Sequence, residues 1–382
     1  MSTLPPRAVE LLRAVHERPG LTRAEAAKTL DLGTGALTTL VNRLQDARMV
    51  AQAAAAPTGS RGRPTTALVP HPDGPLVGVG LVTHRSWVVR VVEVGGAVVA
   101  ETTGGILGAT DGDAVVRDLR RAVDDLDARL DGRVRAAGIA VPGPVRDNRW
   151  VKATLLDWSD QDVPALWGAV DRPTDVPLVV VGNDATLAAV GEARRGAARG
   201  SHTHLHLHLG IGMGGAVTAG GEALDGDHGA AGEFGHMPFG DPERACPCGA
   251  HGCWGRTMDG EDLARALGDP TPADPLAYSE RVLDRAAAGD VAAAAAVQAQ
   301  ARSLGRGAAG LVNALDPTLV TLGGLAPRLL AVAPDAVRAA YRSGLMSYRR
   351  ADPPPLRTAG LGDAAPLVGA AELVWDRLWQ TG

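Results

Sequence analysis

The sequence is poor in cysteine and in aromatic residues, and it has no long hydrophobic run. Its 382 residues include three cysteines, and aromatic residues make up 3% of the chain. An odd cysteine count and the lack of an apolar segment near Met1 argue against secretion and a disulfide framework, so we expect a reducing cytoplasm. Gly, Arg or Asp interrupts every apolar stretch before it reaches the ~18 to 20 residues of a membrane helix. The sequence therefore predicts a soluble protein.

Charge is distributed unevenly along the chain. The net charge of −5 argues, taken alone, against a protein that coats nucleic acid. Residues 1–66, however, hold nine basic and five acidic residues, whereas the remainder holds 29 basic and 38 acidic ones. The first aromatic residue is Trp87, and a segment rich in Pro and Gly lies near residue 70. We therefore expect a small basic domain over 1–70, a linker over 71–75 and a large acidic domain over 76–382.

The small domain has the pattern of a winged helix-turn-helix. Apolar spacing predicts helices over 6–17, 23–30 and 34–47. Thr22 and Glu25 have the spacing of a capping box at the start of the second helix. Two short strands, over 49–54 and 66–69, flank a basic tip. This order of elements is typical of a DNA-binding module with a wing.

The third helix would present a polar face suited to base edges and phosphates. Its candidate DNA-contacting residues are Thr34, Thr38, Thr39, Asn42 and Arg43. Arg61 and Arg63 on the wing could enter a minor groove. The alternative is an ordinary polar face used for dimerisation. We favour binding to double-stranded DNA, because the helix order, the capped helix and the local positive charge agree.

The large domain alternates strands and helices in two similar cycles. The first cycle has strands over 76–82, 87–94, 97–103, 136–141 and 177–181, with helices over 113–130 and 185–195. The second begins with a strand over 203–209, and the chain ends in a helix over 364–380. This repetition predicts two α/β lobes with a cleft between them. Lobe 1 would cover about 76–185 plus 364–380, and lobe 2 about 186–363.

His236, Cys246, Cys248 and Cys253 lie within eighteen residues and include every cysteine of the chain. Three thiolates and one imidazole form a closed tetrahedral ligand set, which is typical of structural zinc. The alternative is a group of reduced thiols without metal. His251 is a competing imidazole in the same segment.

Residues 229–236, which read GAAGEFGH, and residues 246–253, which read CPCGAHGC, resemble the signature of the ROK family (repressors, open reading frames and kinases). The resemblance implies an actin/hexokinase-like (ribonuclease H-like) fold, with the N-terminal winged helix of the family's repressor branch. It also implies that His236 is the metal ligand. The family's sugar contacts match Asn183, Asp184, Glu233 and His236, and Asp184 falls on the catalytic base of the kinases. An Asn-Asp pair also serves as a turn and helix N-cap, and both roles can hold together.

The chain departs from the family pattern at several positions. Gly255 replaces a carboxylate that grips the sugar, and residues 154–158 replace an Asn-Leu-x-Gly-Trp segment. Residues 80–85 lack the Asp and the Gly-Gly of the kinase phosphate loop. In the glycine run 209–215, Ile211 stands where a phosphate-binding Thr is usual, and such a run also serves a tight turn. We therefore expect no catalysis, with Asp184 as a ligand contact.

Four histidines alternate along one predicted strand: His202, His204, His206 and His208. Alternation places them on one face, where they could form a second metal site or a pH-responsive surface. The alternative is that these imidazoles pack against helices or meet solvent at the end of the sheet. We favour packing.

The leading hypothesis is a transcriptional repressor that dimerises, or forms a dimer of dimers, and responds to a sugar or sugar derivative. Effector binding would change the spacing of two winged helices by its differential affinity for two arrangements. The first alternative is an ATP-dependent sugar kinase with a fused DNA-binding domain. The second is a zinc-stabilised protein that binds DNA without an effector.

Overall fold

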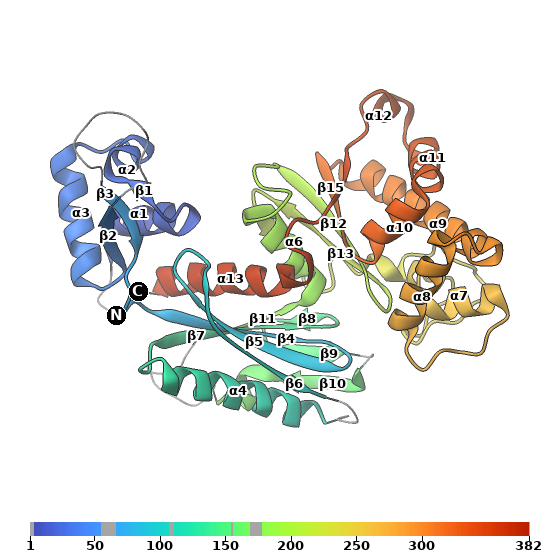
Figure 1. The fold of residues 1–382 in the computed structure, drawn as a ribbon, viewed down its shortest axis with the longest axis horizontal. Coiled ribbons are helices and arrows are strands. Elements are labelled where there is room, and N and C mark those ends of the chain that lie inside the picture. Colours follow the sequence, from blue (N-terminus) through green and yellow to red (C-terminus); the bar gives the residue numbers. More distant parts are fainter. Residues whose placement is uncertain (1–3, 55–65, 107–110, 154–155, 169–177, 382) are drawn as a thin grey trace. The chain divides into compact units, whose positions relative to one another are not determined.

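The structure is a computed structural model that describes residues 4–54, 66–106, 111–153, 156–168 and 178–381 (Figure 1). The chain divides into two compact units. The first unit comprises residues 1–140, 161–181 and 370–382, and the second comprises 141–160 and 182–369. No helix among the described residues is both long and apolar enough to cross a membrane.

The N-terminal module is a winged helix-turn-helix. Its helices are α1 (Pro6–Glu17), α2 (Arg23–Thr29) and α3 (Thr34–Asp46), and its strands are β1 (Leu21–Thr22), β2 (Val50–Ala54) and β3 (Thr66–Pro70). The strands form an antiparallel sheet in the order β1-β3-β2. The capping box is present, because the Glu25 carboxylate accepts the Thr22 backbone N–H and the Thr22 hydroxyl accepts the Glu25 N–H. Strand β1 is too short to be recognised from alternation.

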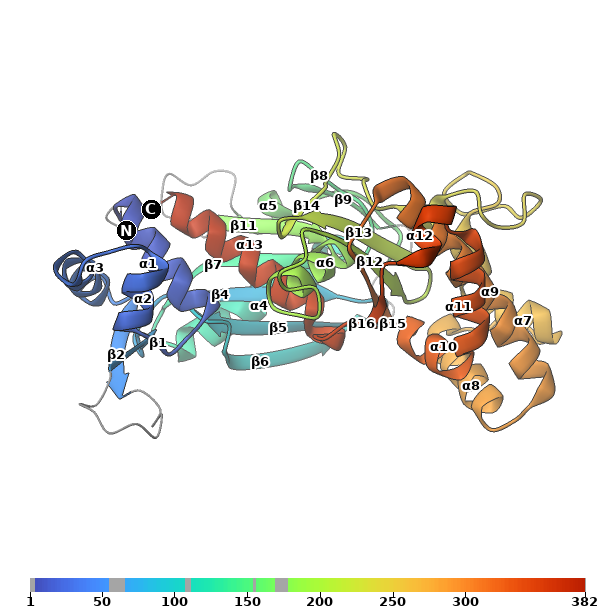
Figure 2. The same ribbon diagram turned by 90° about the horizontal axis from the view of Figure 1, so that it is seen from above.

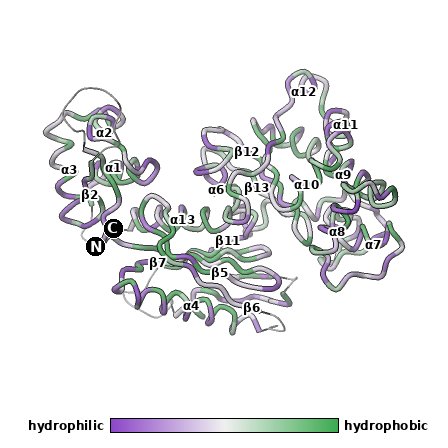
Figure 3. Tube along the Cα trace, in the orientation of Figure 1, coloured by the Kyte–Doolittle hydropathy of each residue, from purple (hydrophilic) through white to green (hydrophobic). Residues whose placement is uncertain are grey.

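A five-stranded sheet dominates the rest of the first unit, in the order β11-β7-β4-β5-β6. Its strands are β4 (Leu76–Val82), β5 (Ser86–Glu93), β6 (Val98–Gly105), β7 (Val134–Val141) and β11 (Leu178–Asn183). Hydrophobic residues follow the central strands (Figure 3). Helix α4 (Gly112–Arg129) covers one face, where a Cβ at Gly80 would lie 3.2 Å from Leu119. Helix α13 (Ala365–Thr381) covers the other, where a Cβ at Gly138 would lie 2.8 Å from Val374 (Figure 1).

The winged helix packs directly on α13. His16 of α1 is 2% exposed, and its Nε2 lies 3.0 Å from Oε1 of Glu372. The backbone N–H of Gly95 donates to His16 Nδ1 over 2.8 Å, so Nε2 carries the ring proton when the imidazole is neutral. The ring also meets the edge of Trp379, and α1 lies beside α13 in both Figure 1 and Figure 2. The winged helix-turn-helix is therefore attached through buried contacts as well as through the chain.

The second unit is built on another five-stranded sheet, in the order β14-β13-β12-β15-β16. Its strands are β12 (Thr203–Leu209), β13 (Met213–Ala219), β14 (Glu222–Ala223), β15 (Leu319–Gly324) and β16 (Leu356–Thr358). Leu205, Leu207 and Leu209 point from β12 into a buried core that includes residues of the long helix α9 (Val291–Leu315). The other helices of this unit are α6 (Asp184–Arg194), α7 (Gly260–Leu267), α8 (Pro275–Ala287), α10 (Ala326–Val332), α11 (Pro334–Gly344) and α12 (Ser347–Ala351).

The remaining described elements are short. They are β8 (Val145–Arg146), β9 (Trp150–Ala153), β10 (Trp158–Asp162) and α5 (Val163–Leu166), of which the three strands form a small sheet. The 3₁₀ helices Phe234–His236, Trp254–Thr257 and Gly362–Ala364 connect larger elements. The observed order confirms the predicted fold class, a winged helix-turn-helix followed by a two-lobed α/β domain.

Candidate functional site

His236, Cys246, Cys248 and Cys253 come together in the second unit. One ligand atom from each lies within 4.8 Å of the others. The Cys246 thiol is 3.7 Å from Nδ1 of His236, and the Cys248 and Cys253 sulfur atoms are 3.7 Å apart. Such separations suit sulfur and nitrogen atoms that surround one ion at about 2.1 to 2.3 Å. The donor set fits a tetrahedral metal ion without rearrangement of the backbone, and His251 is not part of it.

Tight turns hold the cysteines in place. The N–H of Gly249 donates to the Cys246 carbonyl, and Gly249 has a φ of +93°, which an L-residue would adopt only with strain. Trp254, next to Cys253, is fully buried and donates from Nε1 to the Ser303 hydroxyl. The loop is thus anchored to α9 on one side, while Cys248 remains exposed. A bound ion would connect this anchored side to His236.

Asn183 and Asp184 stand where β11 ends and α6 begins. The Asn183 side chain caps α6 by accepting the Thr186 N–H, and its amide donates to the Gly143 carbonyl. Asp184 accepts the N–H of Ala185. The turn and N-cap role expected of this pair is present, and it leaves one carboxylate oxygen of Asp184 available to a ligand.

Glu233 and His236 are brought next to the start of β13 by close backbone packing. A Cβ at Gly232 would lie 2.3 Å from the Gly215 carbonyl oxygen, and one at Gly235 would lie 2.1 Å from that of Met213. Only glycine permits this approach. His236 therefore offers Nδ1 to the cysteine cluster, while its Nε2 lies 3.7 Å from Oε2 of Glu233.

The two carboxyl groups of this region are hard to ionise. Burial raises the pKa of Asp184 to about 6, and the negative charge of Glu233 raises it further against the Ala185 hydrogen bond. Burial also raises the pKa of Glu233, while His236 lowers it. Asn183, Asp184, Glu233 and His236 are thus a polar, partly desolvated group next to the cysteine cluster. Such a group can accept hydrogen bonds from the hydroxyls of a ligand.

The backbone at Gly255 leaves space for a larger side chain at this position. A Cβ there would lie 3.2 Å from the Gly235 carbonyl oxygen and 3.5 Å from the Met213 nitrogen, and its φ is not in the left-handed region. A larger residue would need only a small adjustment. Local sterics therefore do not require the replacement of the family carboxylate by glycine.

The two segments at the family's phosphate-loop positions form close turns and strand contacts within the chain. Residues 83–86 form a tight turn in which the Thr83 hydroxyl donates to the Ser86 carbonyl and accepts the Arg85 and Ser86 N–H groups. In the run 209–215, a Cβ at Gly215 would lie 2.5 Å from the His206 carbonyl oxygen. The close packing of β12, β13 and the Phe234 loop therefore accounts for this glycine without a ligand.

The candidate DNA-contacting residues of α3 lie on one side of the helix. Thr34, Thr39, Asn42 and Arg43 are exposed, whereas Leu37, Val41 and Leu44 are buried. Thr38 is half-buried and accepts a hydrogen bond from Arg23 of α2 over 2.5 Å. Arg23 also reaches Gln52 of β2 and so ties the helices to the wing sheet. Sequence reasoning missed this positioning role. Arg61 and Arg63 lie outside the described residues.

The histidines of β12 are divided by burial. His202 precedes the strand and is exposed, so the expectation that all four share a strand face is wrong for this residue. His204 and His206 are buried, and their Nε2 and Nδ1 atoms lie 2.6 and 2.8 Å from the Thr321 hydroxyl. Burial lowers the pKa of His204 to about 4 and lowers those of His206 and His208 as well. These rings are therefore packed as neutral groups at pH 7.

Comparisons with known proteins agree with this arrangement. The ROK family profile matches residues 109–377, and a MarR family profile matches residues 2–62. A glucokinase of Streptomyces coelicolor is 30% identical over 311 residues, which covers 74% of this chain and 96% of that protein. A glucokinase of Halalkalibacterium halodurans is 30% identical over 69% of this chain and 84% of its own length.

Solved structures extend the likeness to both modules. A ROK family transcriptional regulator, described as a homologue of the E. coli MLC protein, superposes with a TM-score of 0.78. It covers 98% of this chain and 97% of its own at 21% identity, so it shows the shared fold. A ROK hexokinase from Thermus thermophilus is 30% identical, with a TM-score of 0.63 over 80% of this chain and 100% of its own. The chain therefore belongs to the ROK family and has the fold of a ROK transcriptional regulator with an N-terminal winged helix-turn-helix.

Proposed function

We propose that the protein is a cytoplasmic DNA-binding transcriptional repressor whose ROK domain binds a sugar or sugar derivative. The observation that carries this proposal is the joining, in one chain, of a capped helix-turn-helix to a ROK domain through the buried pair His16 and Glu372. Buried polar partners hold a geometry, because separating them leaves each one unsatisfied. A change in the ROK domain can then reach the recognition helix through α13.

DNA would be contacted by the exposed residues of α3 and by the wing. Thr34, Thr38, Thr39, Asn42 and Arg43 are assigned to the major groove, and Arg61 and Arg63 to the minor groove or backbone. We further propose that the protein acts as a homodimer or a dimer of dimers on a pseudo-palindromic operator, because paired half-sites match a two-fold symmetric protein.

The effector would be held by Asn183, Asp184, Glu233 and His236. Carboxylates and an amide suit the hydroxyl groups of a sugar, and the relatives named as glucokinases and hexokinase support that ligand class. Asp184 would act as a hydrogen-bond acceptor. Phosphoryl transfer is not proposed, because residues 80–85 offer no carboxylate for Mg²⁺ and no glycine-rich phosphate cradle.

We assign a structural zinc ion to His236, Cys246, Cys248 and Cys253. The Cys₃His set matches the ligand preference of zinc and leaves no open position for catalysis. The ion would fix the orientation of His236 through Nδ1 and leave its Nε2 facing Glu233. Zinc binding would thereby shape the effector site without touching the effector.

DNA binding is tested by selecting genomic fragments with the purified protein and measuring affinity against salt. Replacing Arg61 and Arg63 with Ala should weaken binding to all sequences and reduce the salt slope by about 1 for each lost phosphate contact. Arg43→Ala should cost about 1 to 3 kcal/mol and relax sequence preference if it reads a base. Arg302→Ala, an exposed position on α9 with the same charge change, is the control. Absent or salt-independent binding would refute the proposal.

Effector binding is tested by thermal shift with hexoses and N-acetylhexosamines. A ligand that prefers the native state raises the Tm, and Asp184→Asn should remove the shift. Gly255→Glu should enlarge it, because the position has space for the family carboxylate. If no sugar of the panel raises the Tm of the wild type or of Gly255→Glu, the result would favour the alternative of a protein that binds DNA without an effector. ADP release on a sugar, lost in Asp184→Asn, would favour the sugar kinase.

A further inference from the structure

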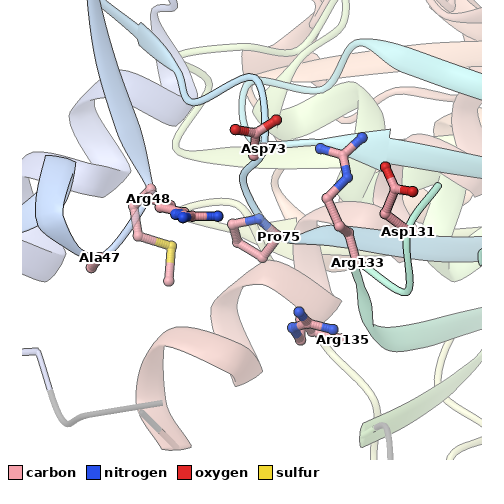
Figure 4. Close-up of a pocket in the computed structure, with 8 residues that line it drawn as sticks. Ala47, Arg48, Asp73, Pro75, Asp131, Arg133 and Arg135 are labelled. Atoms are coloured by element: carbon pink, nitrogen blue, oxygen red, sulfur yellow. The ribbon is translucent and has the colours of Figure 1, made fainter.

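A charged pocket lies where the winged helix, the segment 71–75 and the first lobe meet. Its volume is about 480 Å³, within the range of small-molecule sites. Arginine side chains enter from both sides of the junction, and the charged residues that line it are Arg48, Arg133, Arg135, Asp73 and Asp131 (Figure 4). All of them belong to the first unit. The pocket is distinct from the group around Asp184, which lies in the second unit.

The backbone of the junction is closely packed. Arg48 follows the end of α3 with a φ of +55°, and its carbonyl oxygen would lie 3.0 Å from a Cβ at Gly74. Arg133, at the start of β7, donates to the carbonyls of Pro72 and Gly74 over 2.7 and 3.3 Å. The segment 71–75 is thus held between the recognition helix and the sheet of the first lobe. The walls of the pocket are fixed by these contacts.

Most of the guanidinium donors in the pocket make no hydrogen bond to the residues that the structure describes. A guanidinium has five N–H groups. Arg135 donates to the Gly132 carbonyl over 2.6 Å, and Arg133 uses Nε and one terminal nitrogen on backbone carbonyls. The Arg48 side chain forms no hydrogen bond or ion pair with any residue that the structure describes, although its backbone N–H donates to the Gln45 carbonyl.

The charges of the pocket favour an anion. Three arginines face two carboxylates, and neither Asp73 nor Asp131 forms an ion pair within the described ranges. The guanidinium fork matches the oxygen atoms of a phosphate, which it can bind with two parallel hydrogen bonds. A phosphate between Arg48 on one side and Arg133 and Arg135 on the other would place a negative charge next to three cations. It would accept hydrogen bonds from guanidinium groups on both sides of the junction.

We propose that this pocket binds the phosphate group of a small phosphomonoester, or inorganic phosphate. A phosphate of the DNA backbone is a different occupant. The residues assigned to DNA extend from Thr34 to Arg43 on α3, whereas the pocket lies past the end of that helix and is concave. A bound phosphate would connect Arg48, at the end of the recognition helix, to the first lobe. An effect of bound phosphate on DNA affinity rests on the proposed function, whereas phosphate binding itself does not.

Binding is measured first without DNA, by calorimetry on the full chain with inorganic phosphate at constant ionic strength. Saturable binding is expected, and Arg48→Ala should weaken it about tenfold, since a charge-assisted bidentate contact is lost. Arg135→Ala should weaken it too, which guards against a local distortion in the first variant. Arg129→Ala removes an exposed charge at the end of α4, outside the pocket, and should leave the affinity unchanged. Absence of saturable binding, or equal losses in all three variants, would overturn the proposal.

The second measurement is DNA affinity with and without phosphate, again at constant ionic strength. Phosphate should change the operator Kd of the wild type about fivefold or more, a coupling of the usual size, and should leave that of Arg48→Ala unchanged. If phosphate binds and no DNA is bound at all, the site stands and the proposed function fails. If Arg48→Ala weakens DNA binding in the absence of phosphate, and phosphate does not bind, the arginines contact the DNA backbone and the site is refuted.

Discussion

The second unit holds two groups of histidine that differ in their surroundings. His236 is exposed, lies 3.7 Å from a cysteine sulfur and has its other nitrogen toward a carboxylate. His204 and His206 are buried under α6 and share the hydroxyl of Thr321. The same side chain thus belongs to a cluster that could hold a metal ion in one place and is a packed, neutral ring in the other. Neighbouring donors and acceptors, not the residue type, decide its role.

The comparison also explains why sequence spacing was specific for one group and left alternatives open for the other, although the favoured alternative, packing, is confirmed for His204 and His206. Ligands for a single ion must converge, so the clustering of His236 with three cysteines carries meaning by itself. Alternation along a strand states only which face a side chain takes. Thr321, whose hydroxyl His204 and His206 share, lies more than one hundred residues away in sequence. The two groups should therefore respond differently to metal, pH and substitution.

Removal of the metal should have the largest effect. Zinc contributes on the order of 10 kcal/mol to small peptides that fold around it, and we expect a smaller loss of several kcal/mol here because α9 and Trp254 also anchor the loop. Chemical denaturation with and without a chelator, together with metal analysis, measures this loss. Cys253→Ser should reproduce it without a chelator. A well-folded sample with far less than one equivalent of zinc and no chelator effect would contradict the assignment, while the packed histidines would be unaffected.

Acidification should act mainly on the buried histidines of β12. Burial lowers the pKa of His204 from 6.5 to about 4, so the unfolded chain binds protons that the folded chain does not. The contribution of the neutral His204 to the free energy of unfolding is fully present above pH 6.5. It falls as the pH drops toward 4, by up to about 3 kcal/mol at 1.36 kcal/mol per pKa unit. His206 and His208 act in the same sense, and Asp363 beside His208 opposes it.

The pH measurement needs a difference between two proteins. Asp184 and Asp259 have pKa values that burial raises to about 6, so acidification from pH 7 removes an unfavourable buried charge and opposes the loss. Protons also displace zinc from its ligands. Both contributions are common to the wild type and to His204→Gln, so they cancel when the two free energies of unfolding are subtracted. The acid slope should be smaller in His204→Gln, and equal slopes would show that His204 binds protons equally in the folded and unfolded chain.

Parts of the fold could be predicted because they depend on local chemistry. Thr22 and Glu25 mark the start of α2 through a capping box, and the helices and strands around them follow apolar spacing. The attachment of the winged helix could not be predicted, because His16 meets Glu372 across 356 residues of sequence. No periodicity signals such a pair. The segment 71–75 reads as a linker for the same reason, although Arg133 holds its carbonyls in place.

The candidate sites show the same limit. The cysteine spacing and the glycines at 249 and 252 predict the metal cluster, since tight turns and ligands are both local. The pocket lined by Arg48, Arg133 and Arg135 was missed, because nothing in the sequence connects the end of the third helix to the start of a strand 85 residues later. Likewise, the partner that orients Thr38 is Arg23, on a different helix.

Thr321→Val should have an intermediate effect. The substitution keeps the shape of a fully buried side chain and removes the hydroxyl shared by His204 and His206. Two buried nitrogen atoms then lose a partner, at about 1 to 3 kcal/mol each before relaxation, so a loss of about 2 to 4 kcal/mol is expected. Thr218→Val is the matched control, because its hydroxyl makes one longer contact of 3.3 Å to His204. A loss no greater than that of the control would argue that the histidines do not depend on Thr321.

His202→Gln should have the smallest effect, within about 0.5 kcal/mol of the wild type, because the residue is exposed and precedes β12. The same change at His206 replaces a buried ring and should cost several times more. The two substitutions are identical in chemistry and four residues apart, so the difference between their effects measures the burial of His206 together with its contact to Thr321. Denaturant unfolding at pH 7.5, where both imidazoles are neutral in the unfolded chain, keeps protonation out of the result. Equal effects at the two positions would mean that β12 does not bury its histidines, and would remove the contrast with His236.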